Sequence, residues 1–126
     1  MDNTTLIHTF ESCVNNLITH DFPLPIDNIS GQIHLTHKCK YYGISYHKTK
    51  DGIMYHIIGI NANFVRNGTD KAITNTIYHE LLHTLPGCQN HGKLWKMYAK
   101  KVHDLFGFNI CRIGGDKTTA DANCLR

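Results

Sequence analysis

The sequence predicts an α+β fold in which an N-terminal helix, a three-stranded, mainly antiparallel sheet and two further helices surround one core. Changes in the spacing of apolar residues support this prediction. Apolar residues recur at helical spacing near the N-terminus and again after residue 70, whereas they alternate with a period of two between Ile29 and Asn61. The length of 126 residues suits one domain and is too short for two separate cores.

The composition argues against membrane and secreted proteins. No apolar run approaches the roughly 20 residues that span a bilayer, so we expect no membrane partner. The N-terminus, MDNTTLIHTFESC, lacks the basic region followed by an apolar region that a secretory signal requires. We therefore expect a cytoplasmic protein.

The cysteines and the net charge narrow the functional classes further. The five cysteines are odd in number and never form a C-x-x-C pair, which argues against both a disulfide framework and a zinc ribbon. We expect free thiols at Cys13, Cys39, Cys88, Cys111 and Cys124. The net charge of +3 permits an anionic partner such as nucleic acid but does not require one. Nothing in the sequence indicates a particular oligomeric state.

Residues 3–20 are predicted to form the first helix. Asn3 or Thr4 can cap its start, and Pro23 and Pro25 follow its end, where proline cannot continue a helix. Its apolar stripe consists of Leu6, Ile7, Phe10, Val14, Leu17 and Ile18. This helix should therefore lay one face on the core.

The region from Ile29 to Asn61 is predicted to form three antiparallel strands. Alternation is clear around Ile33, again from Tyr42, and most clearly from Met54 onward. The turn signal Lys50-Asp51-Gly52 predicts a hairpin between the second and third strands. Four histidines should lie on exposed strand faces: His34, His37, His47 and His56.

The second long helix is predicted to begin at Asp70, which is a good N-cap residue, after a turn at residues 66–69. Its core stripe is spaced by fours and consists of Ile73, Ile77, Leu81 and Leu85. His79 and His83 lie on another side of the helix, so the core does not account for them.

The last helix is predicted from Lys93 to Phe106, with Gly107 as its C-cap. Its apolar face consists of Trp95, Tyr98, Ala99, Val102 and Phe106. A basic stripe lies opposite, formed by Lys93, Lys96, Lys100 and Lys101. We expect this stripe to be a solvated face; contact with an acidic partner or a nucleic acid backbone is the weaker alternative. Residues 114–126 are polar and are expected to form a flexible tail.

The stretch Tyr78–Trp95, YHELLHTLPGCQNHGKLW, contains an H-E-x-x-H motif. Histidines at i and i+4 share one helix face about 6 Å apart, so His79 and His83 can bind one metal ion. Glu80 is placed to deprotonate a water molecule on that metal. The chain has ten histidines but only two glutamates, and with these counts the motif would arise by chance roughly one time in a hundred.

The third metal ligand is predicted to be His91. Pro86 and the glycine after it end the helix and turn the chain back toward the motif. Pro86 and Gln89 occupy the positions where metzincins have glycine and histidine, and no glutamate follows at thermolysin-like distance, where His103 and Asp104 stand instead. Three histidines leave the fourth zinc position for water, which is typical of a catalytic site.

This ligand set predicts peptide hydrolysis with Zn²⁺ as the cofactor. Each histidine must be neutral to bind zinc, so the affinity for zinc should fall below a pH of about 6.5. Zinc polarises the scissile carbonyl and activates water. Glu80 takes the proton from the water and passes it to the leaving amine.

The motif and its surroundings resemble the SprT-like metallopeptidase domain. The resemblance rests on H-E-x-x-H, a short loop, and His91-Gly92 followed by the bulky Trp95. Ile58–Asn61 resembles the family's strand before the active-site helix. Gly107–Ile110 resembles the family's segment after the last helix. The resemblance covers most of residues 3–113, so a domain at 1–113 is expected.

The resemblance implies a compact zincin-like domain of the minigluzincin type. It also implies zinc ligands at His79, His83 and His91, and a catalytic base at Glu80. Eukaryotic members of the family cut proteins that are crosslinked to DNA. The sequence contains no dedicated DNA-binding module, so a protein or peptide substrate is the expected partner and nucleic acid a weaker one.

Two alternatives remain at the level of sequence. Zinc endoribonucleases of the YbeY type also bind zinc through three histidines, but they lack a glutamate directly after the first, which Glu80 supplies here. A non-catalytic zinc-binding domain would close the site with a fourth protein ligand, for which Cys88 and His103 are the candidates.

Overall fold

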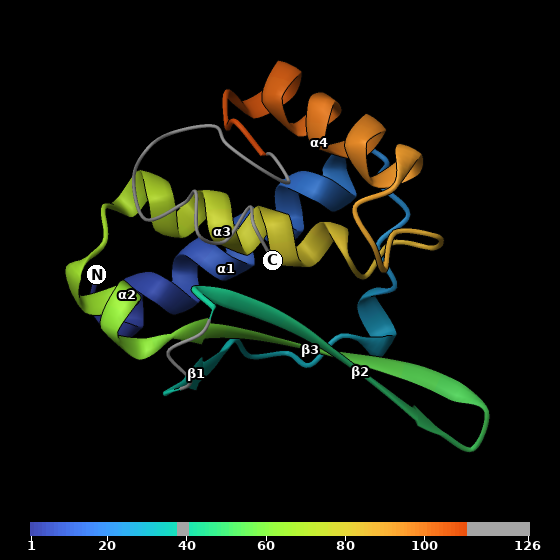
Figure 1. Ribbon diagram of the computed structural model, residues 1–126, viewed down its shortest axis with the longest axis horizontal. Helices are drawn as coiled ribbons and strands as arrows, with labels where there is room; N and C mark the ends of the chain where they lie inside the picture. The colour runs from blue at the N-terminus through green and yellow to red at the C-terminus, as the bar shows by residue number, and fades with distance from the viewer. Residues whose placement is uncertain (38–40, 111–126) are drawn as a thin grey trace.

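The computed structural model describes residues 1–37 and 41–110 of the chain. These residues form helices and one β-sheet, which confirms the predicted α+β class (Figure 1). The elements in chain order are α1 (Asn3–Thr19), the short 3-10 helix η1 (Ile26–Asn28), β1 (His34–Thr36), β2 (Gly43–Lys50), β3 (Ile53–Asn61), α2 (Ala62–Asn67), α3 (Asp70–Leu82) and α4 (Lys93–Phe106).

The three strands form one mixed sheet with the order β1-β3-β2. β2 is antiparallel to β3 over its full length, as predicted, but β1 runs parallel to β3. The prediction of antiparallel pairing for the first strand is therefore wrong. β1 and β2 are neighbours in sequence, yet they lie on opposite sides of β3 and cannot form a hairpin. The nearly continuous apolar run Ile57–Ile60 fits β3 as the central strand.

The β2–β3 hairpin forms at the predicted turn. Asp51 and Gly52 have φ angles of 53° and 79°, and a two-residue hairpin loop of type I′ needs positive φ at both positions. The side chains of Ile53, Met54 and Tyr55 at its tip are exposed. The tip therefore projects away from the core (Figure 1).

The prediction that His56 is exposed is wrong, because only 4% of the residue is accessible. His56 shares one face of β3 with Ile58 and Ile60, which are buried in the core. His47 lies directly opposite on β2, and the two Nδ1 atoms are 2.8 Å apart. The other three histidines of this region are exposed, as predicted: His34 in β1, His37 just after it and His47 in β2.

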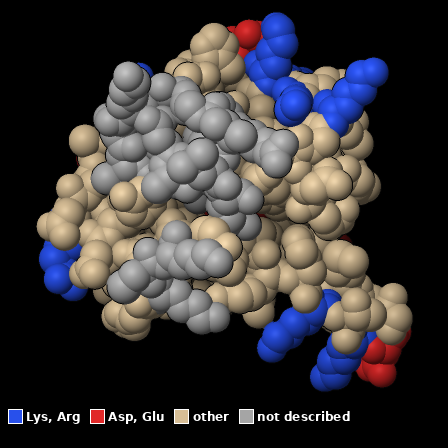
Figure 2. Space-filling model, in the orientation of Figure 1, with Lys and Arg blue, Asp and Glu red and all other residues tan. Residues whose placement is uncertain are grey.

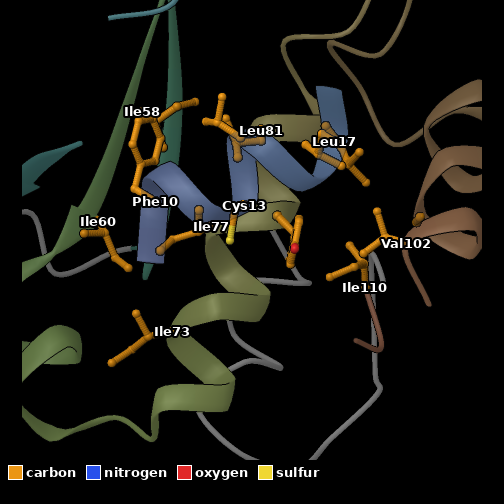
Figure 3. Close-up of a cluster of buried hydrophobic side chains, with 14 of the residues drawn as sticks. Phe10, Cys13, Leu17, Ile58, Ile60, Ile73, Ile77, Leu81, Val102 and Ile110 are labelled. Carbon is orange, nitrogen blue, oxygen red and sulfur yellow. The ribbon is translucent and has the colours of Figure 1, made fainter. Parts of the chain in front are cut away.

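α1 and α3 pack against each other, and α3 contacts both the sheet and α4 (Figure 1). α3 is therefore the central element of the core. Figure 3 shows how side chains of α1, β3 and α3 meet between these elements. The buried residues of this cluster that come from α1 and α3 include Phe10, Cys13, Leu17, Ile73, Ile77 and Leu81.

α1 differs from its prediction at its cap and at the edges of its stripe. Asp2, and not Asn3 or Thr4, caps the helix by accepting a hydrogen bond from the Thr5 amide at 2.7 Å. Ile7 and Ile18 are exposed, at 44% and 43%. The buried stripe is narrower and consists of Leu6, Phe10, Cys13, Val14 and Leu17.

α2 was not predicted, because a six-residue helix is too short to show a periodic pattern. Asn61 ends β3 and caps α2 by accepting a hydrogen bond from the Phe64 amide at 3.0 Å. α2 extends to Asn67, so the predicted turn at 66–69 is shorter than expected. Thr69, and not Asp70, then caps α3 through the Ala72 amide.

α4 has the predicted bounds, and Gly107 ends it with a φ of 80°, as predicted. Trp95, Ala99 and Val102 are buried. The expected flexible tail at 114–126 and the domain boundary at 113 lie outside the described residues, as do the predicted thiols at Cys39, Cys111 and Cys124. Within the described part, no helix is long and apolar enough to cross a membrane.

Candidate metal centre

The last turn of α3 carries two of the three histidines. His79 lies in the helix, and His83 is its C-cap residue, still in helical conformation with φ −68° and ψ −14°. The i, i+4 arrangement therefore survives the helix end, and the two ring centroids are 5.1 Å apart. Both residues are buried, with 1% and 2% of their surface accessible.

A tight turn after α3 brings the third histidine back to the first two. Gly87 has a φ of 76°, a left-handed conformation that disfavours other residues and reverses the chain. His91 follows at the end of the loop and is half-buried. Its Nε2 atom lies 3.1 Å from Nε2 of His79 and 3.2 Å from Nε2 of His83. The structure thus brings all three predicted histidines together.

The spacing of these nitrogens fits a tetrahedral metal ion. Zinc binds histidine nitrogen at about 2.0–2.1 Å, so two ligands of a regular tetrahedral site are about 3.3 Å apart. The candidate ligand atoms of His79, His83 and His91 all lie within 4.8 Å of one another. This group of residues can therefore hold a metal ion.

A backbone hydrogen bond fixes the tautomer that a metal site requires at His83. The Nδ1 atom of His83 lies 2.9 Å from the carbonyl oxygen of Cys88. A carbonyl can only accept, so Nδ1 carries the proton and Nε2 presents its lone pair toward the other two histidines. The turn at Gly87 thus sets both the position of His91 and the orientation of His83.

Glu80 is completely buried beside the first residue of β2. A Cβ atom at Gly43 would lie 3.1 Å from Oε2 and 3.0 Å from Cγ of Glu80, and 2.6 Å from Cγ2 of Thr76. No other residue fits there without displacing α3 or the glutamate. This role of Gly43 was not predicted from the sequence; a glycine at the start of a strand pattern, which can mark close backbone approach, was the available signal.

Trp95 forms one wall of the histidine cluster. Its indole contacts all three imidazoles, with ring centroids 4.9 Å from His79, 5.6 Å from His83 and 4.7 Å from His91. The residue is only 1% accessible. Helical periodicity predicted that Trp95 is buried but gave no indication of these contacts.

The two candidates for a fourth ligand lie outside the cluster. Cys88 is buried with its Sγ directed at the carbonyl oxygen of Pro86, 3.7 Å away, and burial raises the pKa of its thiol. His103 is exposed on α4 beside Asp104. Among the described residues, only His79, His83 and His91 form a group that could hold a metal ion.

On the face shown in Figure 2, basic side chains lie mainly over α4 and over the β2–β3 hairpin, with a smaller group at the left edge. The four predicted lysines of α4 are exposed, as expected for a solvated helix face. Lys100 forms an exposed ion pair with Asp104 at 2.7 Å. Lys101 reaches the carbonyl oxygen of His20 at 3.3 Å and lies over the ring of Phe22, 4.6 Å from its centroid.

Comparison with known proteins identifies one family. The model of the SprT-like family matches residues 9–113, which is most of the chain and includes every residue of the candidate metal centre. No curated protein and no solved structure is significantly similar to the chain.

Proposed function

The chain belongs to the SprT-like family, and on this basis we propose that it is a zinc-dependent metallopeptidase. The observation that carries the proposal is the convergence of three histidine Nε2 atoms next to a buried glutamate. We assign the zinc ligands to His79, His83 and His91 and the catalytic base to Glu80. When bound, zinc polarises the scissile carbonyl and lowers the pKa of water to about 7.

The remaining chemistry falls to Glu80. It follows His79 directly on α3, so its carboxylate can accept a proton from the attacking water and pass that proton to the leaving amine. Its burial against Gly43 removes the carboxylate from bulk water and limits its movement. General acid–base catalysis of this kind contributes about 10²–10⁴-fold to the rate.

The test compares the wild-type chain with Glu80→Gln on an unfolded protein and on RNA. We expect both proteins to bind one equivalent of zinc, and only the wild type to cleave the protein. Gln has nearly the same shape as Glu but cannot accept the proton. Because Glu80 is not a proposed ligand, zinc binding by the variant shows that it is folded. Unchanged proteolysis by Glu80→Gln would refute the assignment.

The same experiment separates the two alternatives. Cleavage of RNA without cleavage of protein would favour the endoribonuclease, although the glutamate after the first histidine supports a peptidase. Zinc binding without any cleavage would favour a non-catalytic domain. That alternative needs a fourth protein ligand, and neither Cys88 nor His103 belongs to the described cluster.

We propose a protein or peptide as the substrate. The exposed lysines of α4 and of the hairpin would tolerate a nucleic acid on the surface of the protein, so a DNA-associated protein is a compatible substrate. Adding duplex DNA to the cleavage assay tests this extension. We expect a stimulation that disappears at high salt, because phosphate contacts are screened.

A further inference from the structure

We propose that Trp95 is a positioning residue that holds the three histidines of the proposed zinc site in their ligand arrangement before the metal binds. This inference rests on the zinc site proposed above. It adds a role for a residue that does not bind the metal.

The contacts of Trp95 support this role. The indole lies nearly parallel to the ring of His83, with an interplanar angle of 22° and ring centroids 5.6 Å apart. It meets His79 and His91 edge-on, at 65° and 88°. Torsions at the imidazole ring have broad, shallow preferences, so the neighbouring groups decide how each ring is turned. One rigid indole therefore limits the rotation of three rings at once.

The position of Trp95 in the chain explains why one residue can reach all three. His91 comes from the loop and Trp95 from the first turn of α4, four residues later, whereas His79 lies in α3 and His83 is the C-cap residue of that helix. Burying Trp95 against α3 docks the start of α4 and closes the loop. Together with the turn at Gly87, the same contact thus restrains His91, whose backbone lies outside a helix.

The buried indole N–H indicates that Trp95 does more than fill the core. Nε1 is buried and has no hydrogen-bond partner among the described residues. A buried donor without an acceptor costs about 1–3 kcal/mol. A phenylalanine or leucine would fill the core without that cost, so packing alone does not explain a tryptophan at this position. The contact of its large flat ring system with three imidazoles explains it.

The test measures zinc affinity by competition with a chelator in Trp95→Leu and in a matched control, Val102→Ala. Val102 is fully buried on the same helix, two helical turns after Trp95. We expect Trp95→Leu to weaken zinc binding about 10–100-fold, as the loss of groups that orient metal ligands does. Val102→Ala should lower the melting temperature of the metal-free protein yet keep the wild-type zinc affinity.

Trp95→Phe keeps the measurement informative if Trp95→Leu does not fold. Phenylalanine retains an aromatic surface of smaller size, so we expect a partial loss, between wild type and Trp95→Leu. Wild-type affinity in a folded Trp95→Leu or Trp95→Phe, or an equal loss in Val102→Ala, would overturn the proposal. Absence of zinc binding in the wild type would instead refute the proposed function itself, before any variant is compared.

A spectroscopic readout follows from the single tryptophan of the chain. Because Trp95 contacts all three proposed ligands, Co²⁺ bound there should quench its fluorescence, with saturation at one equivalent. His91→Ala should abolish the quenching at the same Co²⁺ concentration. Unchanged fluorescence of the wild type on stoichiometric Co²⁺ binding would contradict the contact between the indole and the site.

Discussion

Gly43 and Glu80 show how a residue far away in sequence constrains the candidate site. A methyl group at Gly43 would overlap Thr76, whose hydroxyl is hydrogen-bonded to the Ala72 carbonyl at 3.0 Å and cannot move freely. Gly43→Ala should therefore displace Glu80. We expect peptidase activity to fall by up to ~100-fold, because small misplacements of catalytic groups are costly, and stability to fall by about 1–3 kcal/mol.

The control for Gly43→Ala is Gly31→Ala. No atom lies within 4 Å of a Cβ built at Gly31, so the same substitution should leave activity and stability nearly unchanged. Zinc stoichiometry should be one in both variants, since neither residue touches a proposed ligand. Wild-type activity in Gly43→Ala would contradict the close approach of β2 to Glu80.

His56 should make the stability of the fold sensitive to acid. Burial, and then the neighbouring His47, lower the pKa of His56 below 6.5. The unfolded chain therefore binds its proton first. The contribution of His56 to the free energy of unfolding is complete above a pH of about 6.5. This contribution is lost as the pH falls from there toward the pKa of His56 in the folded state.

The measurement is the melting temperature of the metal-free protein between about pH 7.5 and about pH 5.5, where this group changes charge. We expect His56→Gln to lose less stability than the wild type over this range, because the group that binds a proton on unfolding is gone. The comparison variant is His8→Gln, which removes a histidine from the exposed face of α1 and so separates the effect of the buried site from that of losing any histidine. Identical pH profiles for wild type and His56→Gln would contradict the account.

The sequence predicted the candidate site wherever local spacing decides the geometry. Helical spacing alone places His79 near His83, and the Pro86-Gly87 turn returns His91 to them. Local spacing could not predict the contacts between different helices and strands. The approach of Gly43 to Glu80 and the packing of Trp95 on three imidazoles depend on how β2 and α4 dock on α3.

At the scale of elements, the cap of α3 is open to a direct test. The Thr69 hydroxyl accepts a hydrogen bond from the Ala72 amide at 3.1 Å. Thr69→Ala should lower the free energy of unfolding by about 1 kcal/mol, the usual cost of losing a cap. Chemical denaturation measures this change.

Thr74→Ala provides the matched control, because it is the same substitution in the interior of the same helix. Alanine has the higher helix propensity there, so stability should stay constant or rise slightly. An equal loss in both variants would show that Thr69 does not act as a cap.

Long periodic elements were predicted well, and short or paired ones were not. α4 has the predicted bounds because a full apolar face and Gly107 mark it. α2 is too short to show periodicity. Asn61 is both the last residue of β3 and the N-cap residue of α2. The alternation in β1 identifies a strand, but it carries no information on the direction of its partner.

At the scale of the whole molecule, metal binding should be linked to folding. The proposed ligands come from α3 and from the loop before α4, so the site exists only when these segments are docked. A ligand that binds only the folded state at 100 times its Kd adds about 2.7 kcal/mol of stability. We expect zinc to raise the melting temperature of the wild type and of Glu80→Gln, and not that of His91→Ala.

Calorimetry or fluorescence melting with and without a chelator checks this expectation. A zinc-dependent rise that persists in His91→Ala would place the bound ion elsewhere. The comparison also shows whether the loop between α3 and α4 contributes to the stability of the fold through the metal.

Anomalous X-ray diffraction at the zinc edge, from crystals of the zinc-loaded chain, locates the metal directly. We expect a single ion bound by Nε2 of His79, His83 and His91 at about 2.0–2.1 Å, with its remaining position open to solvent. An ion bound elsewhere, or one closed by a fourth protein ligand such as Cys88 or His103, would contradict the catalytic site.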